Sequence, residues 1–211
     1  MDRRIVLTLA AASVVGCGGR SDSAPLVQPE TMPLPTGMFA GQKVAVFPVT
    51  YVVAEEELGW RDALGAREER LLRADSLLKE FLLERVPETD WVFPDQLRRA
   101  ARRNPGMVRD PDRVGAASLR APGIDKVPAP LISNMRNLVA IVGDRYALVP
   151  AAVIFGEPID TTLEGGMVEL TVSVVDVRRG LVRFYGAAYG VADEPWAAFR
   201  IALDDFLPIK R

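Results

Sequence analysis

Histidine is absent from this sequence of 211 residues, and cysteine occurs only once, as Cys17. Histidine is a common general base, the usual partner of a nucleophilic serine or cysteine, and the most frequent metal ligand in proteins. Its absence therefore excludes hydrolases of the Ser-His or Cys-His type and histidine-ligated zinc sites. A lone cysteine can form neither a disulfide within the chain nor a thiolate metal cluster.

Other features of ligand-binding proteins are lacking as well. The 26 basic and 28 acidic residues give a net charge of −2, which provides no electrostatic footprint for nucleic acid. No G-x-G-x-x-G, P-loop or EF-hand pattern occurs, so we expect no nucleotide, cofactor or metal. Beyond the N-terminal segment, no apolar run approaches the roughly 20 residues that a membrane-spanning helix needs.

The N-terminal segment has the features of a lipoprotein signal peptide. Arg3 and Arg4 precede an uncharged stretch, 5–15, which has the length of a signal-peptide core and is too short to span a bilayer. The sequence VVGC, ending at Cys17, resembles a lipobox, in which the cysteine thiol is acylated and the preceding peptide is removed. We therefore predict a signal peptide over 1–16 and a palmitate-type lipid anchor on Cys17. The alternative is an ordinary secretory signal with a chance cysteine.

The residue after the cysteine indicates which membrane holds the anchor. Gly18 stands where an aspartate would resemble the inner-membrane retention signal of enterobacterial lipoproteins. We therefore expect outer-membrane anchoring with the protein facing the periplasm, and inner-membrane anchoring is the alternative. Residues 17–40 are rich in Gly, Ser and Pro, which predicts a short disordered tether. Residues 18–36 span at most about 60 Å when extended, so the folded domain stays close to the membrane.

Hydrophobic periodicity predicts one globular α/β domain over residues 41–211. Helical spacing is clearest in 66–86, where Leu71, Leu78 and Leu82 fall on one face. The expected elements are strands at 43–49, 91–93, 146–155, 166–177 and 181–191, and helices at 66–86, 94–104, 131–143 and 195–207. Together they predict a single sandwich of a mixed sheet, of about five strands, covered by helices.

The last third of the domain carries the clearest strand pattern. From 168 to 174, valine and leucine alternate with more polar residues such as Thr171 and Ser173, which predicts a half-buried strand. The DVRRG turn ending at Gly180 joins it to the next strand as a hairpin. By contrast, residues 106–130 are interrupted by prolines and predict a loop with at most one helical turn.

Three groups of acidic residues are candidates for general acid–base chemistry. They lie at Glu55–Glu57, at Asp110 with Asp112, and at Asp204 with Asp205. The first two groups fall in predicted loops and the third on the polar side of the last helix, where solvated charge is the ordinary interpretation. We therefore predict no catalytic residues and a protein that is not an enzyme.

A basic stripe is the densest charge feature of the sequence. Arg98, Arg99, Arg102 and Arg103 pair at spacings of four on one predicted helix. The simplest interpretation is a solvated helix face. The alternative is a membrane-facing surface, which anionic lipid head groups would attract with about 1 kcal/mol per basic residue.

Three aromatic residues are candidates for a surface that binds a protein partner. Trp60 lies in a predicted loop, while Tyr185 and Tyr189 fall on the outward phase of the last strand. Exposed aromatic side chains are enriched in protein interfaces. If helices cover both faces of the sheet, the two tyrosines belong to the core instead.

Several stretches together resemble a known group of bacterial envelope domains. The domain opens with the strand KVAVFPV, continues to the strand–helix step DWVFPDQL, and ends with the hairpin VELTVSVVDVRRGLVRFYGAAYG. With the step NLVAIVGDRYALVPAAVIFG between them, this pattern covers roughly 41–207. It is similar to the periplasmic α/β domain shared by the curli-secretion channel lipoprotein (CsgG), the Pel polysaccharide-export lipoprotein, the lipoprotein activators of penicillin-binding proteins and the TolB N-terminal domain.

The resemblance implies a non-enzymatic envelope lipoprotein. Domains of this group bind partners or assemble into rings beneath the outer membrane, so we expect a scaffold or adaptor in envelope assembly or export, with a ring-forming homo-oligomer as one form. The long alternating pore hairpins of the curli-type channel have no counterpart in the proline-broken segment 106–130, which argues against a pore. The alternatives are a small-molecule-binding lipoprotein and a hydrolase that uses two carboxylates.

Overall fold

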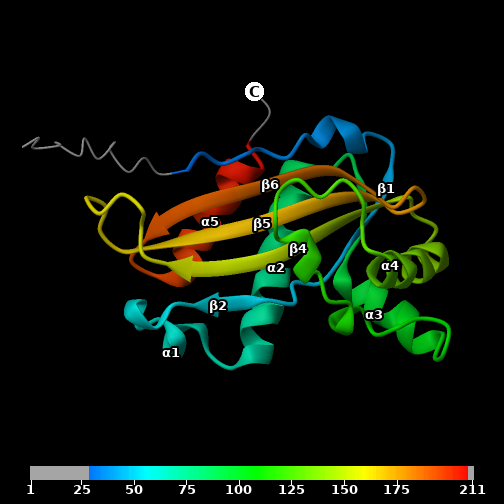
Figure 1. The fold of residues 1–211 in the computed structure, drawn as a ribbon, viewed down its shortest axis with the longest axis horizontal. Coiled ribbons are helices and arrows are strands. Elements are labelled where there is room, and N and C mark those ends of the chain that lie inside the picture. Colours follow the sequence, from blue (N-terminus) through cyan, green and yellow to red (C-terminus); the bar gives the residue numbers. More distant parts are fainter. Residues whose placement is uncertain (1–28, 209–211) are drawn as a thin grey trace, which may run out of the picture.

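A six-stranded mixed sheet runs through residues 29–208, the part of the chain that the computed structural model describes (Figure 1). The predicted signal peptide over 1–16 and the predicted lipidation site Cys17 lie outside the described residues. Five strands follow the order β3–β1–β4–β5–β6, and β2 pairs with β4. The strands are β1 (Lys43–Val46), β2 (Val52–Ala54), β3 (Asp90–Val92), β4 (Tyr146–Gly156), β5 (Gly166–Asp176) and β6 (Leu181–Ala192).

Two kinds of strand pairing meet at β4. The strands β1 and β2 run parallel to it, whereas β5 runs antiparallel to β4 and β6 antiparallel to β5. This combination confirms the predicted α/β class with a mixed sheet. The strand that periodicity did not predict is β2, because its three residues are too few to show an alternation.

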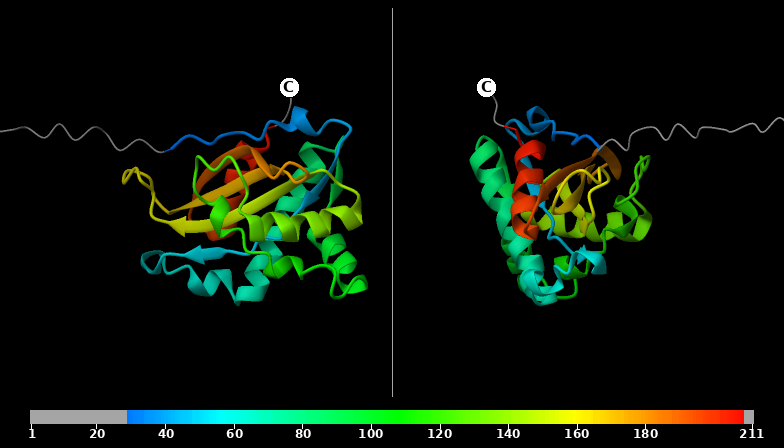
Figure 2. Two further views of the ribbon diagram at one scale, coloured as in Figure 1. Left: turned by 45° about the vertical axis from the view of Figure 1, so that its right-hand side comes forward. Right: turned by 90° about the vertical axis from the view of Figure 1, so that its left-hand side faces the viewer.

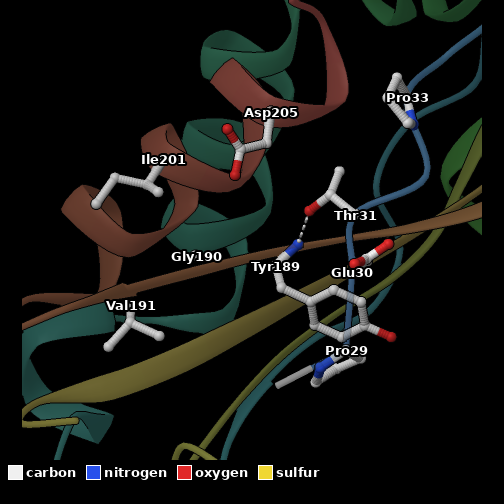
Figure 3. Close-up of a pocket in the computed structure, with 9 residues that line it drawn as sticks. All are labelled: Pro29, Glu30, Thr31, Pro33, Tyr189, Gly190, Val191, Ile201 and Asp205. Atoms are coloured by element: carbon white, nitrogen blue, oxygen red, sulfur yellow. Dashed lines mark hydrogen bonds between the residues drawn. The ribbon is translucent and has the colours of Figure 1, made fainter. Parts of the chain in front are cut away.

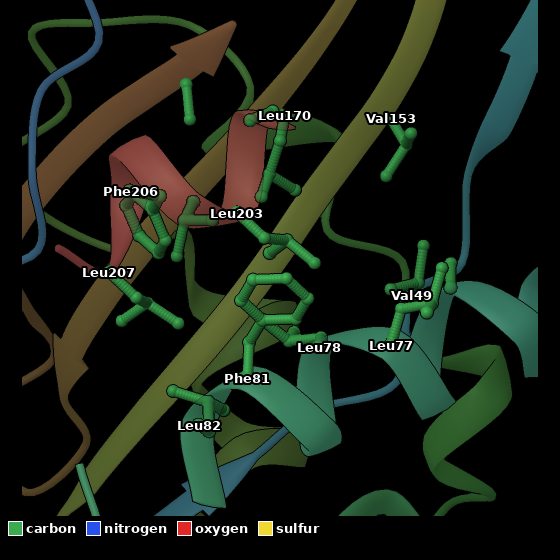
Figure 4. Close-up of a cluster of buried hydrophobic side chains, with 14 of the residues drawn as sticks. Val49, Leu77, Leu78, Phe81, Leu82, Val153, Leu170, Leu203, Phe206 and Leu207 are labelled. Carbon is green, nitrogen blue, oxygen red and sulfur yellow. The ribbon is translucent and has the colours of Figure 1, made fainter. Parts of the chain in front are cut away.

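Helices cover the two faces of the sheet unequally (Figures 1 and 2). They are α1 (Arg61–Leu64), α2 (Arg67–Arg85), α3 (Pro94–Arg103), α4 (Ala129–Val142) and α5 (Pro195–Phe206). The helices α2 and α5 pack on one face, where Phe81, Leu203 and Phe206 belong to one buried cluster with Leu170 of β5 (Figure 4). No helix among the described residues is both long and apolar enough to cross a membrane.

The second face has a smaller core at one end of the sheet. Leu97 of α3 and Met135 of α4 pack there with Ala147, near the start of β4. The loop before α4 extends this cover, since the Ser173 hydroxyl donates to the carbonyl oxygen of Leu119 at 3.3 Å. The predicted half-buried β5 is therefore buried more completely than its alternation suggested: Thr171 and Ser173 are only 2% and 1% exposed.

The N-terminal part of the described chain lies against the edge of β6. The Met32 N–H donates to the Ala187 carbonyl at 2.9 Å, and the Leu34 N–H donates to the Phe206 carbonyl at 2.9 Å. Leu34 and Phe39 are both buried in the first core. The structure thus departs from the predicted boundary between a tether over 17–40 and a domain from 41 onward. The segment is rich in proline, as linkers are, but the burial of Leu34 and Phe39 holds it against the domain.

A glycine brings α5 close to β6. A β-carbon added at Gly190 would lie 2.2 Å from the carbonyl oxygen of Ala198, far inside van der Waals contact. The backbone of α5 therefore occupies the space that a side chain at position 190 would need. This close approach fixes α5 beside the free edge of the sheet.

Candidate functional site

The strand order reverses at β1, which lies between β3 and β4. From β1 the chain reaches β3 on one side through α2, and then returns to β4 on the other side through α3 and α4. In open α/β sheets, ligands bind outside the carboxyl ends of the strands at such a switch point. A groove of about 370 Å³ lies there, lined by Val49, Thr50, Arg67, Glu68, Leu71, Leu72, Arg98 and Asp112. We call it the α2–α3 groove.

Two carboxylates hold the arginine at the centre of this groove. The Arg98 Nη2 donates to Asp75 Oδ2 at 2.8 Å and to Asp112 Oδ1 at 2.6 Å, while its Nε donates to Asp112 Oδ2 at 2.8 Å. The other oxygen of Asp75 accepts the backbone N–H of Val49 at 2.7 Å. The network therefore joins α2, α3, the loop after α3 and the segment that follows β1.

Burial dominates the electrostatics of Asp75. Loss of water around its carboxyl raises the pKa to about 6, against the opposing effects of the Val49 N–H and the Arg98 guanidinium. Hydrogen bonding to Asp112 raises the pKa of Arg98 further, so the guanidinium stays charged. Near neutral pH the network therefore contains one cation between two carboxylates. Ionising Asp75 costs free energy because this carboxyl is buried.

The network is better suited to holding the groove together than to chemistry in it. Both oxygens of Asp75 and both oxygens of Asp112 accept hydrogen bonds from protein groups. A general acid or nucleophile needs a carboxyl oxygen directed at a substrate. The groove instead offers apolar contact, because Leu72 on its wall is 47% exposed.

The four predicted stripe arginines have separate environments. Arg98 is only 19% exposed on its side chain and holds the two carboxylates, so it does not belong to a solvated helix face. Arg99 pairs with Asp95 at 3.0 Å, one turn earlier on α3. Arg102 and Arg103 are exposed in the last turn of the helix. Carboxylates from α2 and from the loop after α3 set Arg98 apart from the other three arginines, and the spacing within α3 could not reveal these two partners.

Trp60 packs against the domain core. Its ring meets Phe155 edge to face, with centroids 5.8 Å apart, and lies over Gly166, where an added β-carbon would be 2.5 Å from the ring. The ring therefore contributes to core packing. The predicted role of Trp60 in a partner surface stays a prediction.

Tyr185 and Tyr189 lie on the face of the sheet away from α2 and α5, because Ala188, of opposite phase in β6, packs in the core with those helices. Both side chains are half-buried, and the Tyr185 hydroxyl donates to the Arg120 carbonyl at 2.9 Å. Burial, and then the neighbouring carboxylate of Glu169, raises the pKa of each tyrosine. The predicted partner surface over these tyrosines stays a prediction.

The three acidic groups singled out in the sequence lie apart. Asp204 forms an ion pair with Arg85 at 2.6 Å, while Asp205 faces a groove beside β6. Asp110 accepts the backbone N–H of Asp112, and Glu56 pairs with Arg61 at 3.3 Å. Within residues 29–208, no three acidic residues come close enough together to hold a metal ion.

Two buried carboxylates are functional candidates that the sequence analysis missed. Asp75 interrupts the apolar face of α2 next to Ala74, and a charged residue in such a position was the available signal. Asp144 follows α4, and burial raises its pKa to about 6 although Lys43 Nζ lies 3.8 Å away. No local pattern distinguishes Asp144, because its ion-pair partner Lys43 lies far earlier in the chain, at the start of β1.

Comparison with known proteins finds no protein-family model and no curated protein sequence that matches this chain. Among solved structures, the LpoB C-terminal domain from Salmonella enterica is 18% identical with a TM-score of 0.44, and the match covers 74% of this chain and 87% of that chain. Lipoprotein GNA1162 from Neisseria meningitidis is 17% identical with a TM-score of 0.37, covering 72% and 81%. Escherichia coli LpoB is 13% identical with a TM-score of 0.38, covering 89% and 82%.

Similarity at these identities and TM-scores is too distant to assign a function. The solved structures that match include a lipoprotein from Neisseria meningitidis. They do not show the resemblance to CsgG, Pel-export and TolB domains, which stays a prediction.

Proposed function

We propose that this chain is a lipid-anchored envelope protein that acts as an adaptor or scaffold rather than as an enzyme. Acylated Cys17 would hold it on the outer membrane, facing the periplasm, and the α2–α3 groove would bind a protein partner. The observation that carries the proposal is the exposed Leu72 on the wall of a groove whose arginine is already neutralised by Asp75 and Asp112.

The internal pairing of charges favours binding over catalysis. Hydrolysis with two carboxylates requires an acid and a base or nucleophile on opposite sides of a substrate. Here the two carboxylates share one guanidinium, and Asp75 is 8% exposed. An apolar contact beside a rigid polar network is, by contrast, typical of a protein interface.

The anchor is tested by metabolic labelling with a palmitate analogue. The wild-type chain should carry the label on Cys17 and sediment with outer membranes. A Cys17→Ser variant should lose the label and appear in the soluble periplasmic fraction. A variant that still sediments with membranes as before would contradict the proposed anchor.

The partner surface is tested with a matched pair of positions on α2. Leu72 and Leu83 are 47% and 49% exposed, but only Leu72 lines the α2–α3 groove. A photo-crosslinking amino acid at Leu72 should capture a defined envelope protein, whereas the same amino acid at Leu83 should not. With that partner purified, Leu72→Glu should weaken binding and Leu83→Glu should leave it unchanged. Equal effects at the two positions would overturn the assignment of the groove.

A further inference from the structure

A second and larger groove follows the free edge of β6. Its volume is about 650 Å³, and it runs between the N-terminal segment and α5 (Figure 3). We call it the β6-edge groove. Its lining residues are Pro29, Glu30, Thr31, Pro33, Tyr189, Gly190, Val191, Ile201 and Asp205.

The floor of the β6-edge groove is a strand edge with backbone groups available for pairing. The Tyr189 N–H donates to the Thr31 hydroxyl at 3.0 Å, and the Ala187 carbonyl accepts from Met32, so residues 187 and 189 direct their backbone groups away from β5. The two-residue period of a strand directs both backbone groups of Val191 the same way. Among the hydrogen bonds of the described residues, none uses these two groups or the Tyr189 carbonyl. Such an edge is a template for an added strand.

The charges of the groove all have one sign. Glu30 comes from the N-terminal segment and Asp205 from α5, and no lysine or arginine is among the lining residues. Figure 3 shows these two carboxylates on opposite sides of the groove. A third carboxylate, Glu169, lies directly across from Tyr189 in the pairing of β5 with β6.

The remaining side chains suit an extended peptide. The Tyr189 ring can stack with a cationic side chain, an interaction that adds to the attraction of nearby carboxylates. Val191 and Ile201 add apolar contact, and Ile201 is 42% exposed. Because the side chains of a bound strand point alternately to two sides, those on one side can meet Asp205 and Ile201 of α5 and those on the other can meet Glu30 and Tyr189.

We propose that the β6-edge groove binds an extended basic segment of a protein partner by strand addition. The segment pairs with the Val191 N–H and with the carbonyls of Tyr189 and Val191, while its Lys or Arg side chains face Glu30 and Asp205. Main-chain pairing supplies the affinity and the acidic walls supply the selectivity. The acidic walls repel an anionic membrane surface. This inference does not rest on the lipid anchor or on the α2–α3 groove.

The test uses the chain from residue 18 onward, without the lipid, and two fluorescein-labelled peptides. One is Lys-Val-Lys-Val-Lys-Val and the other is Glu-Val-Glu-Val-Glu-Val. Fluorescence anisotropy should show binding of the lysine peptide alone, and about 0.5 M NaCl should weaken it because salt screens exposed charges. Equal binding of the two peptides, or no binding of either, would overturn the proposal.

Matched variants separate local charge from net charge. Glu30→Gln with Asp205→Asn should weaken binding of the lysine peptide about fivefold, as expected for the loss of two exposed ion pairs. Glu56→Gln with Glu57→Gln changes the net charge equally at a site outside the groove and should leave the affinity unchanged. An equal loss in both double variants would contradict the proposed site.

The backbone contribution is tested at Val191. Proline is accepted in an edge strand where its missing N–H faces solvent, so Val191→Pro removes the proposed donor without breaking a bond to β5. This variant should lose at least about tenfold in affinity, while Val191→Thr should bind as the wild type does. Circular dichroism of each variant checks folding. If Val191→Pro does not fold, the acidic double variant alone decides the proposal, and a folded Val191→Pro with full affinity overturns it.

Discussion

The two grooves of this protein use similar residues in opposite ways. In the α2–α3 groove, Arg98 lies between Asp75 and Asp112, and the hydrogen bonds of Arg98 and Asp75 together link four segments of the chain. In the β6-edge groove, Glu30 and Asp205 have no basic side chain between them. Removing one partner of a charge pair inside a fold leaves the other charge buried and uncompensated, whereas charges without partners at the surface are available to another molecule. We therefore expect the loss of a paired charge in the first groove to change stability, and the loss of the unpaired charges in the second to change binding.

The largest effect is expected at Arg98. Replacing it with methionine in Arg98→Met leaves the buried carboxyl of Asp75 without its cation, which should cost about 3–5 kcal/mol in the free energy of unfolding. The loss should shrink below pH 6, where Asp75 is protonated. Urea unfolding at several pH values measures both effects. Arg99→Met, which breaks only an exposed pair, is the control and should cost about 0–1 kcal/mol.

The pH dependence of stability sharpens the same point. The pKa of Asp75 is about 6 in the folded protein and 3.8 without the fold, so the folded state holds the proton more tightly. Stability from this group is therefore highest at low pH and falls as pH rises from about 4 to about 6, by about 2–3 kcal/mol. Asp75→Asn cannot titrate, so its unfolding free energy should lack this fall. Parallel pH curves for the two proteins would refute the assignment.

A smaller loss is expected where α5 meets the floor of the β6-edge groove. Gly190→Ala places a methyl group against the carbonyl of Ala198 and should lower the free energy of unfolding by about 2 kcal/mol through overpacking. Gly37→Ala is the control, since an added β-carbon there meets nothing within 4 Å. Thermal unfolding compares the two, and equal melting temperatures would show that α5 is free to shift.

The smallest effect is expected from the acidic walls of the β6-edge groove. Glu30→Gln with Asp205→Asn should change the free energy of unfolding by no more than about 0.5 kcal/mol, because neither carboxylate is buried or paired within the described chain. A large loss in urea unfolding would mean that the two grooves do not differ in the way described above.

The arrangement of elements could be predicted from the sequence, and the contents of the two grooves could not. Periodicity located α2 and the hairpin of β5 with β6, because each spans enough residues for a repeat to be visible. The pairing of Asp75 with Arg98 and Asp112 joins residues from three separate segments, so no local spacing announces it.

The edge of the sheet escaped prediction for a related reason. Thr31 and Met32 lie in a stretch whose composition is typical of a linker, and their contacts depend on a strand more than 150 positions later in the chain. The average composition of the segment is that of a linker. The two apolar residues that hold it against the domain, Leu34 and Phe39, are too few to change that average.

The attachment of Leu34 beneath the end of α5 has a mechanical consequence. A pull from upstream of Pro29 reaches the hydrogen bond of Thr31 first, then that of Met32, and then the buried side chains of Leu34 and Phe39. Because these contacts are made to β6 and to the end of α5, the force acts on those two elements before it reaches the parallel strands. Tension would thus loosen the rim of the domain and expose additional strand edge while the interior remained folded.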